Sequence, residues 1–295
     1  MSSEGYIAAD EGVRLYFEKL GAGEPAVVIP NGFCYLDDFR FLSRTHTLIV
    51  YDVRNRGRSD SVSEPGKLSR GVLNDIDDLE LVRRHFALDR MTLVGHSYVG
   101  LTVVVYAMRY PGHADRILQI GPMQPSQREQ YAPPLMVADG VMQSVFARIG
   151  ELQKARASMD AEAFCRQSWA ILGEIFVTDP AHAARVAAWG RCELANERMF
   201  MKYWMEHVLP SLQRLELTED DFASVDAPVL TMHGNRDRSA PYGGGRDWAR
   251  QLPNARLMTI DGAGHAPWIE SPDAVFDAID TFIGGAWPDA AVTTR

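Results

Sequence analysis

The chain has 295 residues, of which 46% are apolar and 23% charged, and its formal net charge at pH 7 is −9. This composition is that of an ordinary globular protein long enough to bury a sizeable core. The acidic balance, without a run of Lys or Arg, argues against a nucleic-acid partner, because such binding relies on basic patches. No segment approaches the roughly 18 consecutive apolar residues of a membrane span, so no membrane partner is expected.

Short apolar runs alternate with helix-like segments along most of the chain. Strands are predicted at 13–17, 26–29, 47–51, 91–94, 117–120, 229–232 and 256–260. Several of these runs are continuously apolar rather than alternating, as is typical of strands covered on both faces. Strand, helix and strand in succession predict an α/β fold with a mostly parallel central sheet flanked by helices.

Two helices can be predicted with their ends. Apolar residues from Ile76 to Phe86 repeat with a period of about 3.6, behind Asn74 and Asp75 as candidate N-caps. The last helix is predicted to begin at Ser271-Pro272 and to end at Gly284.

The strand pattern is interrupted once. After residue 120 comes GPMQPSQREQYAPP, and from about Met136 to Phe222 the chain reads only as helix. An insertion at the C-terminal end of a strand lies over the edge where such sheets bind ligands. We therefore predict an α/β core at 1–122 and 225–295, with a helical cap at 123–224.

The stretch MTLVGHSYVGL places Ser97 between a predicted strand and a predicted helix. A serine there is either the N-cap of the helix or a nucleophile on a sharp turn. Only the nucleophile requires an acid and then a histidine at the ends of later strands. Asp237 follows the strand at 229–232, and His265 follows the strand at 256–260. Taken singly, each could be an ordinary turn or solvated residue, but the order Ser, Asp, His favours a catalytic triad.

A serine hydroxyl needs a neutral imidazole to take its proton and a carboxylate to orient that imidazole. The anion on the substrate carbonyl needs preset N–H donors, one after the nucleophile and one from an earlier loop. We expect these donors at Tyr98 and Phe33.

The motifs PNGF, YDVRNRGRSD, GHSYVGL, HGNRD and GAGHAPW, in this order, resemble the α/β-hydrolases of the capped esterase and proline-iminopeptidase-like branch. The resemblance implies the α/β-hydrolase fold and a serine hydrolase that uses no cofactor. Two positions depart from the family pattern. Val99 stands where the turn usually has a small residue, and Asn31 replaces the usual histidine of the oxyanion loop.

The substrate is expected to be a small molecule, and three interpretations stay open. Proline iminopeptidases, which the chain resembles, hold the substrate amine with cap glutamates, and Glu193 and Glu197 are the candidates here, unless both are solvated. The apolar cap, with Trp169 and Trp204, favours a carboxylic ester or lactone, including the large lactones opened by macrolide esterases. Some proteins of this fold with an intact triad instead act as small-molecule receptors.

The cysteines and the N-terminus bear on location. Cys34, Cys165 and Cys192 are odd in number and far apart, as expected of free thiols in a reducing compartment. The segment MSSEGYIAADEGVRL does not read as a secretion signal. We therefore expect a cytoplasmic protein. The histidines have no metal-ligand spacing to Cys or carboxylates, so no metal is expected.

Overall fold

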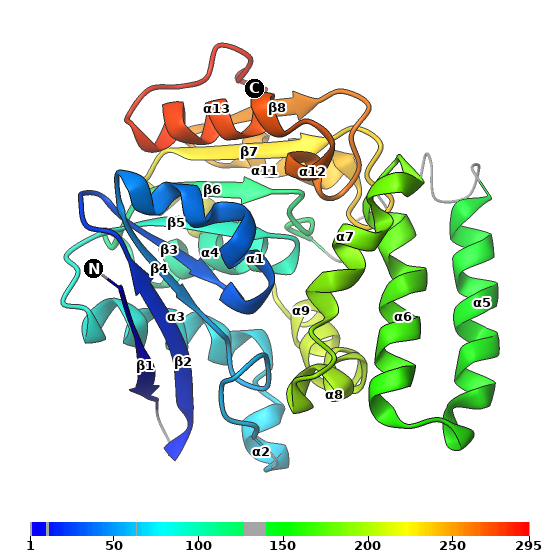
Figure 1. Cartoon of the computed structure of the whole chain (residues 1–295). Coiled ribbons are helices and arrows are strands. Elements are labelled where there is room, and N and C mark those ends of the chain that lie inside the picture. The colour runs from blue at the N-terminus through cyan, green and yellow to red at the C-terminus, as the bar shows by residue number, and fades with distance from the viewer. Residues whose placement is uncertain (1, 10–11, 63, 127–139, 295) are drawn as a thin grey trace.

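The computed structural model describes residues 2–9, 12–62, 64–126 and 140–294. Its centre is an eight-stranded sheet in the order β1-β2-β4-β3-β5-β6-β7-β8 (Figure 1). The strands are β1 (Ser2–Ala8), β2 (Arg14–Leu20), β3 (Ala26–Pro30), β4 (Thr47–Tyr51), β5 (Met91–His96), β6 (Ala114–Ile120), β7 (Val229–Gly234) and β8 (Ala255–Ile260). β2 pairs antiparallel with both β1 and β4. The other strands run parallel, in the order β4, β3, β5, β6, β7 and β8 across the sheet. The predicted fold class is confirmed.

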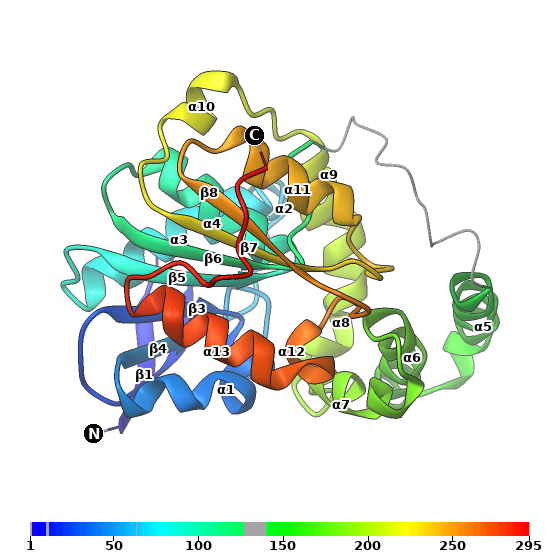
Figure 2. The same ribbon diagram turned by 90° about the horizontal axis from the view of Figure 1, so that it is seen from above.

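Helices cover both faces of the sheet (Figure 2). One face carries α1 (Gly32–Phe39), α12 (Pro267–Glu270) and α13 (Pro272–Ile283), and the other carries α3 (Val72–His85), α4 (Tyr98–Arg109) and α11 (Tyr242–Gln251). Neighbouring residues of β3 point to opposite faces, so Val27 and Val28 belong to two different apolar clusters. This two-sided burial explains why the parallel strands are continuously apolar.

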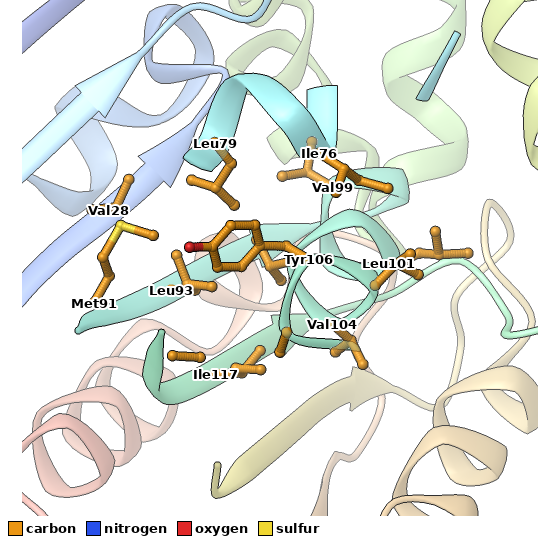
Figure 3. Packing of buried hydrophobic residues seen from close by; sticks show 14 of the residues in the cluster. Val28, Ile76, Leu79, Met91, Leu93, Val99, Leu101, Val104, Tyr106 and Ile117 are labelled. Atoms are coloured by element: carbon orange, nitrogen blue, oxygen red, sulfur yellow. The ribbon is translucent and has the colours of Figure 1, made fainter. Parts of the chain in front are cut away.

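The cluster around α4 holds the turn at Ser97 rigidly. Leu93 of β5 and Val104 of α4 pack with Leu79 of α3 and Ile117 of β6 (Figure 3). All four side chains have no exposed surface. A helix buried on this scale cannot shift easily, because packed interiors have few voids to move into.

Between β6 and β7 most of the described residues are helical. The helices are α5 (Val141–Ala155), α6 (Ala161–Phe176), α7 (Ala183–Ala187), α8 (Ala195–Tyr203), α9 (Leu209–Gln213) and α10 (Glu219–Ala223). In Figure 1, α6 and α7 lie beyond the arrowheads of β6 and β7, that is, at the C-terminal edge of the sheet. The remaining helical pieces are α2 (Pro65–Leu68), the 3₁₀ turns 40–44, 156–158, 180–182 and 188–190, and a π-helical turn at 204–208.

The predicted element ends were correct in some places and wrong in others. α13 begins after Ser271 and ends before Gly284, as predicted. The prediction of Asn74 and Asp75 as N-caps of α3 is wrong. The cap is Gly71, with φ 50°, and both residues are buried inside the helix. β1 was missed because it is an edge strand whose mostly polar side chains are largely exposed.

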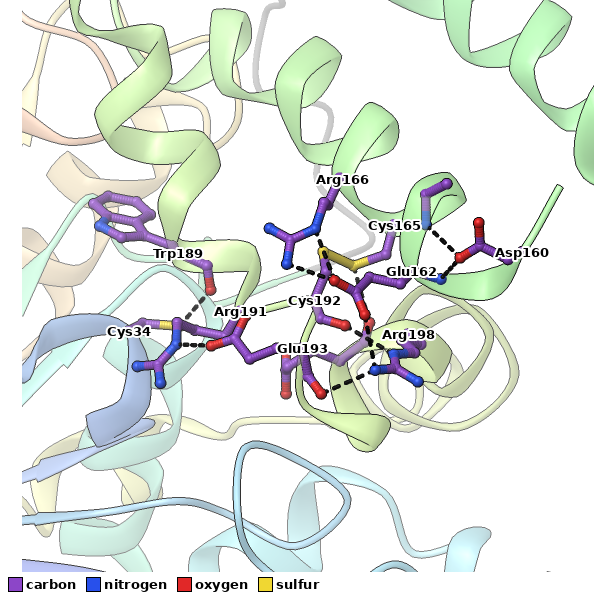
Figure 4. The surroundings of a disulfide bond; sticks show 12 residues. Cys34, Asp160, Glu162, Cys165, Arg166, Trp189, Arg191, Cys192, Glu193 and Arg198 are labelled. Atoms are coloured by element: carbon purple, nitrogen blue, oxygen red, sulfur yellow. Dashed lines mark hydrogen bonds and ion pairs between the residues drawn. A yellow bond between two sulfur atoms is a disulfide. The ribbon is translucent and has the colours of Figure 1, made fainter.

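Two of the three cysteines are joined. Cys165 of α6 and Cys192 form a disulfide with a Cα–Cα distance of 5.8 Å (Figure 4), within the normal range for such bonds. The expectation of three free thiols is therefore wrong, and only Cys34 is free. Because disulfides persist in oxidising compartments, the cysteines no longer favour the cytoplasm. Cytoplasmic localisation stays a prediction. Within the described ranges, no helix has the length and apolarity needed to cross a membrane.

Candidate active site

Ser97 occupies a strained turn between β5 and α4. Its backbone angles are φ 60° and ψ −129°, and its side chain makes no capping hydrogen bond to the helix. A helix N-cap normally has extended backbone angles and accepts a bond from an amide of the first turn. Ser97 N–H donates to Ile120 O at 3.1 Å, and Ser97 O accepts from Met123 N–H at 3.0 Å. The backbone is therefore held, while the hydroxyl has no partner among the residues that the structure describes, which favours the nucleophile over the cap.

Glycines permit the close crossing of strand and helix at this turn. A Cβ on Gly95 would lie 2.5 Å from the Val99 carbonyl oxygen, and one on Gly100 would lie 3.0 Å from the Pro122 side chain. Val99 itself points into the core beside Ile76 (Figure 3). Its size therefore does not obstruct the turn, because the close approach falls on the glycine one position later.

Asp237 and His265 form a buried pair. His265 Nδ1 lies 2.7 Å from Asp237 Oδ2, and both side chains are fully enclosed. The other carboxylate oxygen accepts the amides of Ser239 and Ala240 at 2.7 and 2.8 Å. Burial alone would raise the pKa of Asp237, but the imidazoles of His265 and His233 lower it below its ordinary value. The ionised carboxylate is therefore the stable form.

Sequence reasoning missed His233, at the end of β7. Its Nε2 lies 3.0 Å from the same Asp237 Oδ2 that faces His265, and its side chain has no exposed surface. A second imidazole on one carboxylate oxygen fixes the orientation of that carboxylate. The signal in the sequence was the histidine four residues before the acid in HGNRD.

His96, also missed, supports the base from behind. Its Nε2 lies 2.9 Å from the His265 carbonyl oxygen, and its Nδ1 lies 2.9 Å from the Tyr35 hydroxyl. A carbonyl can only accept, so Nε2 carries the proton and Tyr35 donates to Nδ1. Burial, together with the nearby His265, holds the pKa of His96 well below its ordinary value. His96 is thus a neutral anchor rather than a second base.

The triad elements meet around the turn that follows β6. A Cβ on Gly121 would lie 3.1 Å from His265 Nδ1 and 3.3 Å from Asp237 Oδ2. The preceding residue, Ile120, accepts the Ser97 amide. His265 Nε2 is buried without a hydrogen-bond partner within the described part of the chain. With Nδ1–H directed at Asp237, the lone pair of Nε2 is free to accept a proton.

The structure corrects one of the two predicted oxyanion donors. The Phe33 amide donates to Asp52 Oδ1 at 2.9 Å, and that buried carboxylate also accepts the Arg58 amide at 2.8 Å. Phe33 is therefore already paired and is not a preset donor. Tyr98 is the first residue of α4, where backbone amides lack intrahelical acceptors. Asn31 Nδ2 lies 3.0 Å from the Tyr98 hydroxyl and anchors that side chain. The role of the Tyr98 amide stays a prediction.

A cavity of about 210 Å³ opens at Ser97. Its walls come from the sheet edge, from α1 and from the inserted helices, and they include Asn31, Cys34, Tyr35, Arg56, His96, Ser97, Tyr98, Trp169, Leu172, Phe176, Trp189, Phe200, Met201, Trp204 and Ser239. The two predicted tryptophans, Trp169 and Trp204, are thus both part of the cavity wall. Met142 of α5 lies instead in a separate buried cluster between α5 and α6.

The comparisons with known proteins agree with the fold. Residues 25–272 match the family described as alpha/beta hydrolase fold. The chain belongs to this family. It is 23% identical to a non-heme haloperoxidase of Rhodococcus erythropolis, over 94% of this chain and 98% of that protein. It is 24% identical to a proline iminopeptidase of Xanthomonas citri, over 95% and 96%. The crystal structure of the esterase RhEst1 from Rhodococcus superposes with a TM-score of 0.71 at 19% identity, covering 96% of this chain and 98% of that one.

The two glutamates proposed for amine binding lie in different surroundings in this α/β hydrolase. Glu193 is half-exposed and pairs with Arg191 (Figure 4). Glu197 is only 2% exposed. It binds Arg56 through both carboxylate oxygens, at 2.9 to 3.3 Å, and accepts the Gly57 amide at 2.8 Å. Glu197 is therefore neither solvated nor available as an unpaired carboxylate for a substrate amine.

Arg56 is the third residue that sequence reasoning missed, although it lies in the quoted motif YDVRNRGRSD. Its guanidinium carbon lies 3.5 Å from the ring centre of Phe200 and 4.9 Å from that of Phe33. Burial would lower the pKa of Arg56, but the charge of Glu197 outweighs it and raises that pKa. The hydrolase therefore carries a buried ion pair at the wall of its cavity. No cluster of three or more metal-ligating side chains occurs in the part of the hydrolase that the structure describes.

Proposed function

We propose that the protein hydrolyses a carboxylic ester or lactone through an acyl-enzyme on Ser97. The observation that carries the proposal is the strained Ser97, held by its backbone and without a side-chain partner among the described residues, which meets the enclosed Asp237–His265 pair around the turn that follows β6. A merely structural serine would use its hydroxyl as a cap. Strained backbone at a site that the surrounding structure holds in place is typical of function.

Each residue has one role in the proposed reaction. Ser97 Oγ attacks the ester carbonyl carbon while His265 Nε2 takes the hydroxyl proton. Asp237 stabilises the resulting imidazolium, and the Tyr98 amide donates to the carbonyl oxygen as it becomes negative. The C–O bond to the alcohol then breaks, and the alcohol leaves with the proton from His265. Water, deprotonated by the same imidazole, attacks the acyl carbon and releases the acid and the serine.

The pairing of Glu197 disfavours the proline-iminopeptidase alternative. An N-terminal amine would enter an apolar cavity as an ammonium ion and would need a carboxylate partner. Glu197 is already neutralised by Arg56, and Glu193 is bound to Arg191 at the surface. A free amine would thus compete with an established buried ion pair, whereas a neutral ester would not.

The cavity limits the size of the group it can enclose. Drug-sized ligands occupy sites of roughly 300–1,000 Å³, and this cavity has about 210 Å³. An acyl chain or a small ring fits that space, while a macrolide lactone would place only part of its ring inside. The wall residues Trp169, Phe176 and Trp204 come from the segment between β6 and β7, so we propose that the cap at 123–224 selects the substrate.

The test is a panel of aryl esters, simple lactones, a macrolide and a prolyl anilide, assayed with the wild type, Ser97→Ala, His265→Ala and the double variant. We expect multiple turnovers on esters or lactones. Each single substitution should lower kcat by on the order of 10³-fold or more, with the double variant little worse, because the residues act as a unit. Additive losses would contradict the assignment. Binding with one turnover or none would favour a receptor, and efficient cleavage of the anilide would favour the peptidase.

A further inference from the structure

Arg56 is a charged side chain in the wall of an otherwise largely apolar cavity. It is 3% exposed, and it lines the cavity with Ser97 and Tyr98. The ring of Phe200 lies 3.5 Å from its guanidinium carbon. Planar stacking and bidentate pairing hold a guanidinium in one orientation. The group is therefore fixed before any ligand arrives.

The protein uses only part of the donor capacity of this guanidinium. Glu197 accepts from Nε and Nη2. Nη1 has no acceptor among the residues that the structure describes, yet it is not among the fully enclosed polar atoms that lack a partner. Nη1 therefore keeps some exposure. Since Arg56 lines the cavity, that exposure is toward the cavity.

We infer that Arg56 forms a polar subsite that binds a second, uncharged oxygen of the substrate, such as a ketone or another carbonyl, away from the scissile bond. The inference rests on the proposed ester hydrolysis and specifies its substrate class. An N–H donor on a fixed cation, in an enclosed apolar wall, favours a ligand with an acceptor there.

Charge decides between an uncharged acceptor and an anion. Arg56 and Glu197 together are neutral, and both are enclosed. A substrate carboxylate at Nη1 would place two carboxylates on one guanidinium, leaving a buried net charge of −1. An uncompensated buried charge is strongly unfavourable. A ketone or ester carbonyl gains the hydrogen bond without that penalty.

A purely structural role is the competing explanation, because the pair also joins the 52–59 loop to α8. The chain offers a matched control in Arg54 and Asp78, a second buried pair at 2.6 and 2.7 Å. Neither residue is part of the cavity wall. If the pairs act only in stability, removing either one should have the same effect on substrate choice.

The experiment compares kcat/KM for the 4-nitrophenyl esters of octanoate, 4-, 5-, 6- and 7-oxo-octanoate, and suberate, each normalised to its alkaline hydrolysis rate. Wild type should prefer at least one oxo ester over octanoate by tenfold or more and should use the suberate ester less well than octanoate. The Arg56→Met/Glu197→Gln variant keeps the charge balance. Its kcat/KM values for the oxo esters and for the octanoate ester should lie within threefold of each other. The Arg54→Met/Asp78→Asn control should keep it.

Three results would overturn the inference: no oxo ester preferred by wild type, a preference that survives the loss of Arg56, or a preference for the suberate anion. If the double variant does not fold, Arg56→Lys replaces it and must lower the preference at least threefold, because an ammonium lacks the guanidinium fork. If hydrolysis of the octanoate ester depends on Ser97 but no oxo ester is preferred, only this inference is refuted. Absence of Ser97-dependent hydrolysis of every ester removes the proposed function as well.

Discussion

Replacing Ser97 by Gly should stabilise the protein while abolishing its activity. The backbone at this residue has φ 60° and ψ −129°, a conformation that glycine adopts far more easily than serine. Holding a non-glycine residue in such a region costs about 1–3 kcal/mol. Relief of this strain stabilises the glycine variant, but the greater entropy of glycine in the unfolded chain offsets roughly 0.5–1 kcal/mol of the gain. The free energy of unfolding should therefore rise by about 1 kcal/mol.

Ser97→Ala separates strain from capping. Alanine keeps the Cβ and hence the strain, and no capping hydrogen bond is lost because none exists. Its free energy of unfolding should stay within about 0.5 kcal/mol of wild type, whereas loss of a true serine cap would cost about 1 kcal/mol. Both variants should lose on the order of 10³-fold or more in kcat.

The assay is urea unfolding of the three proteins, with aryl-ester turnover measured on the same samples. The nucleophile assignment would be refuted by the opposite pattern. In that case Ser97→Ala would be destabilised by about 1 kcal/mol, Ser97→Gly by only a few tenths, as expected for a cap, and both would keep hydrolysing ester.

Three further outcomes are expected. Glu197→Gln should lower the free energy of unfolding by about 3–5 kcal/mol, because it leaves a buried guanidinium uncompensated. Glu193→Gln should change it by less than about 0.5 kcal/mol, and equal effects in urea unfolding would contradict the assigned burial. Cys165→Ala opens a bridge spanning 27 residues and should cost up to about 3.5 kcal/mol. The control Cys34→Ala keeps the bridge and should lose stability when reductant is added, whereas Cys165→Ala should behave the same with and without reductant. Burial and a neighbouring carboxylate raise the pKa of Asp75 to about 8, above the roughly 3.9 of an unfolded chain. The folded state therefore binds the proton more strongly, and stability should fall as pH rises from about 4 to 8. Asp75→Asn should flatten that fall, and an unchanged pH slope would contradict the shift.

The sequence alone was sufficient to predict the parallel strands of the sheet and to propose the order Ser, Asp, His at their ends. Strands buried on both faces must be apolar at nearly every position, so runs such as 91–94 and 229–232 could be recognised locally. Ser97, Asp237 and His265 each follow such a strand. Parallel strands bring their C-terminal ends to one edge, so knowing the fold was enough to predict that they gather there. The edge strand β1 was not predicted, because its exposed residues carry no such apolar pattern.

Only the tertiary structure shows which residues from distant parts of the chain pair with one another. Arg56 and Glu197 are 141 residues apart, and Cys165 of α6 is bonded to Cys192, 27 residues further along the chain. The Phe33 amide is taken by Asp52 from a different loop. Local propensity and periodicity describe a residue's own segment, whereas burial, charge compensation and hydrogen-bond pairing depend on what the fold places opposite it. The same glutamate can bind a substrate amine or neutralise an arginine, and only the position of its neighbour decides which.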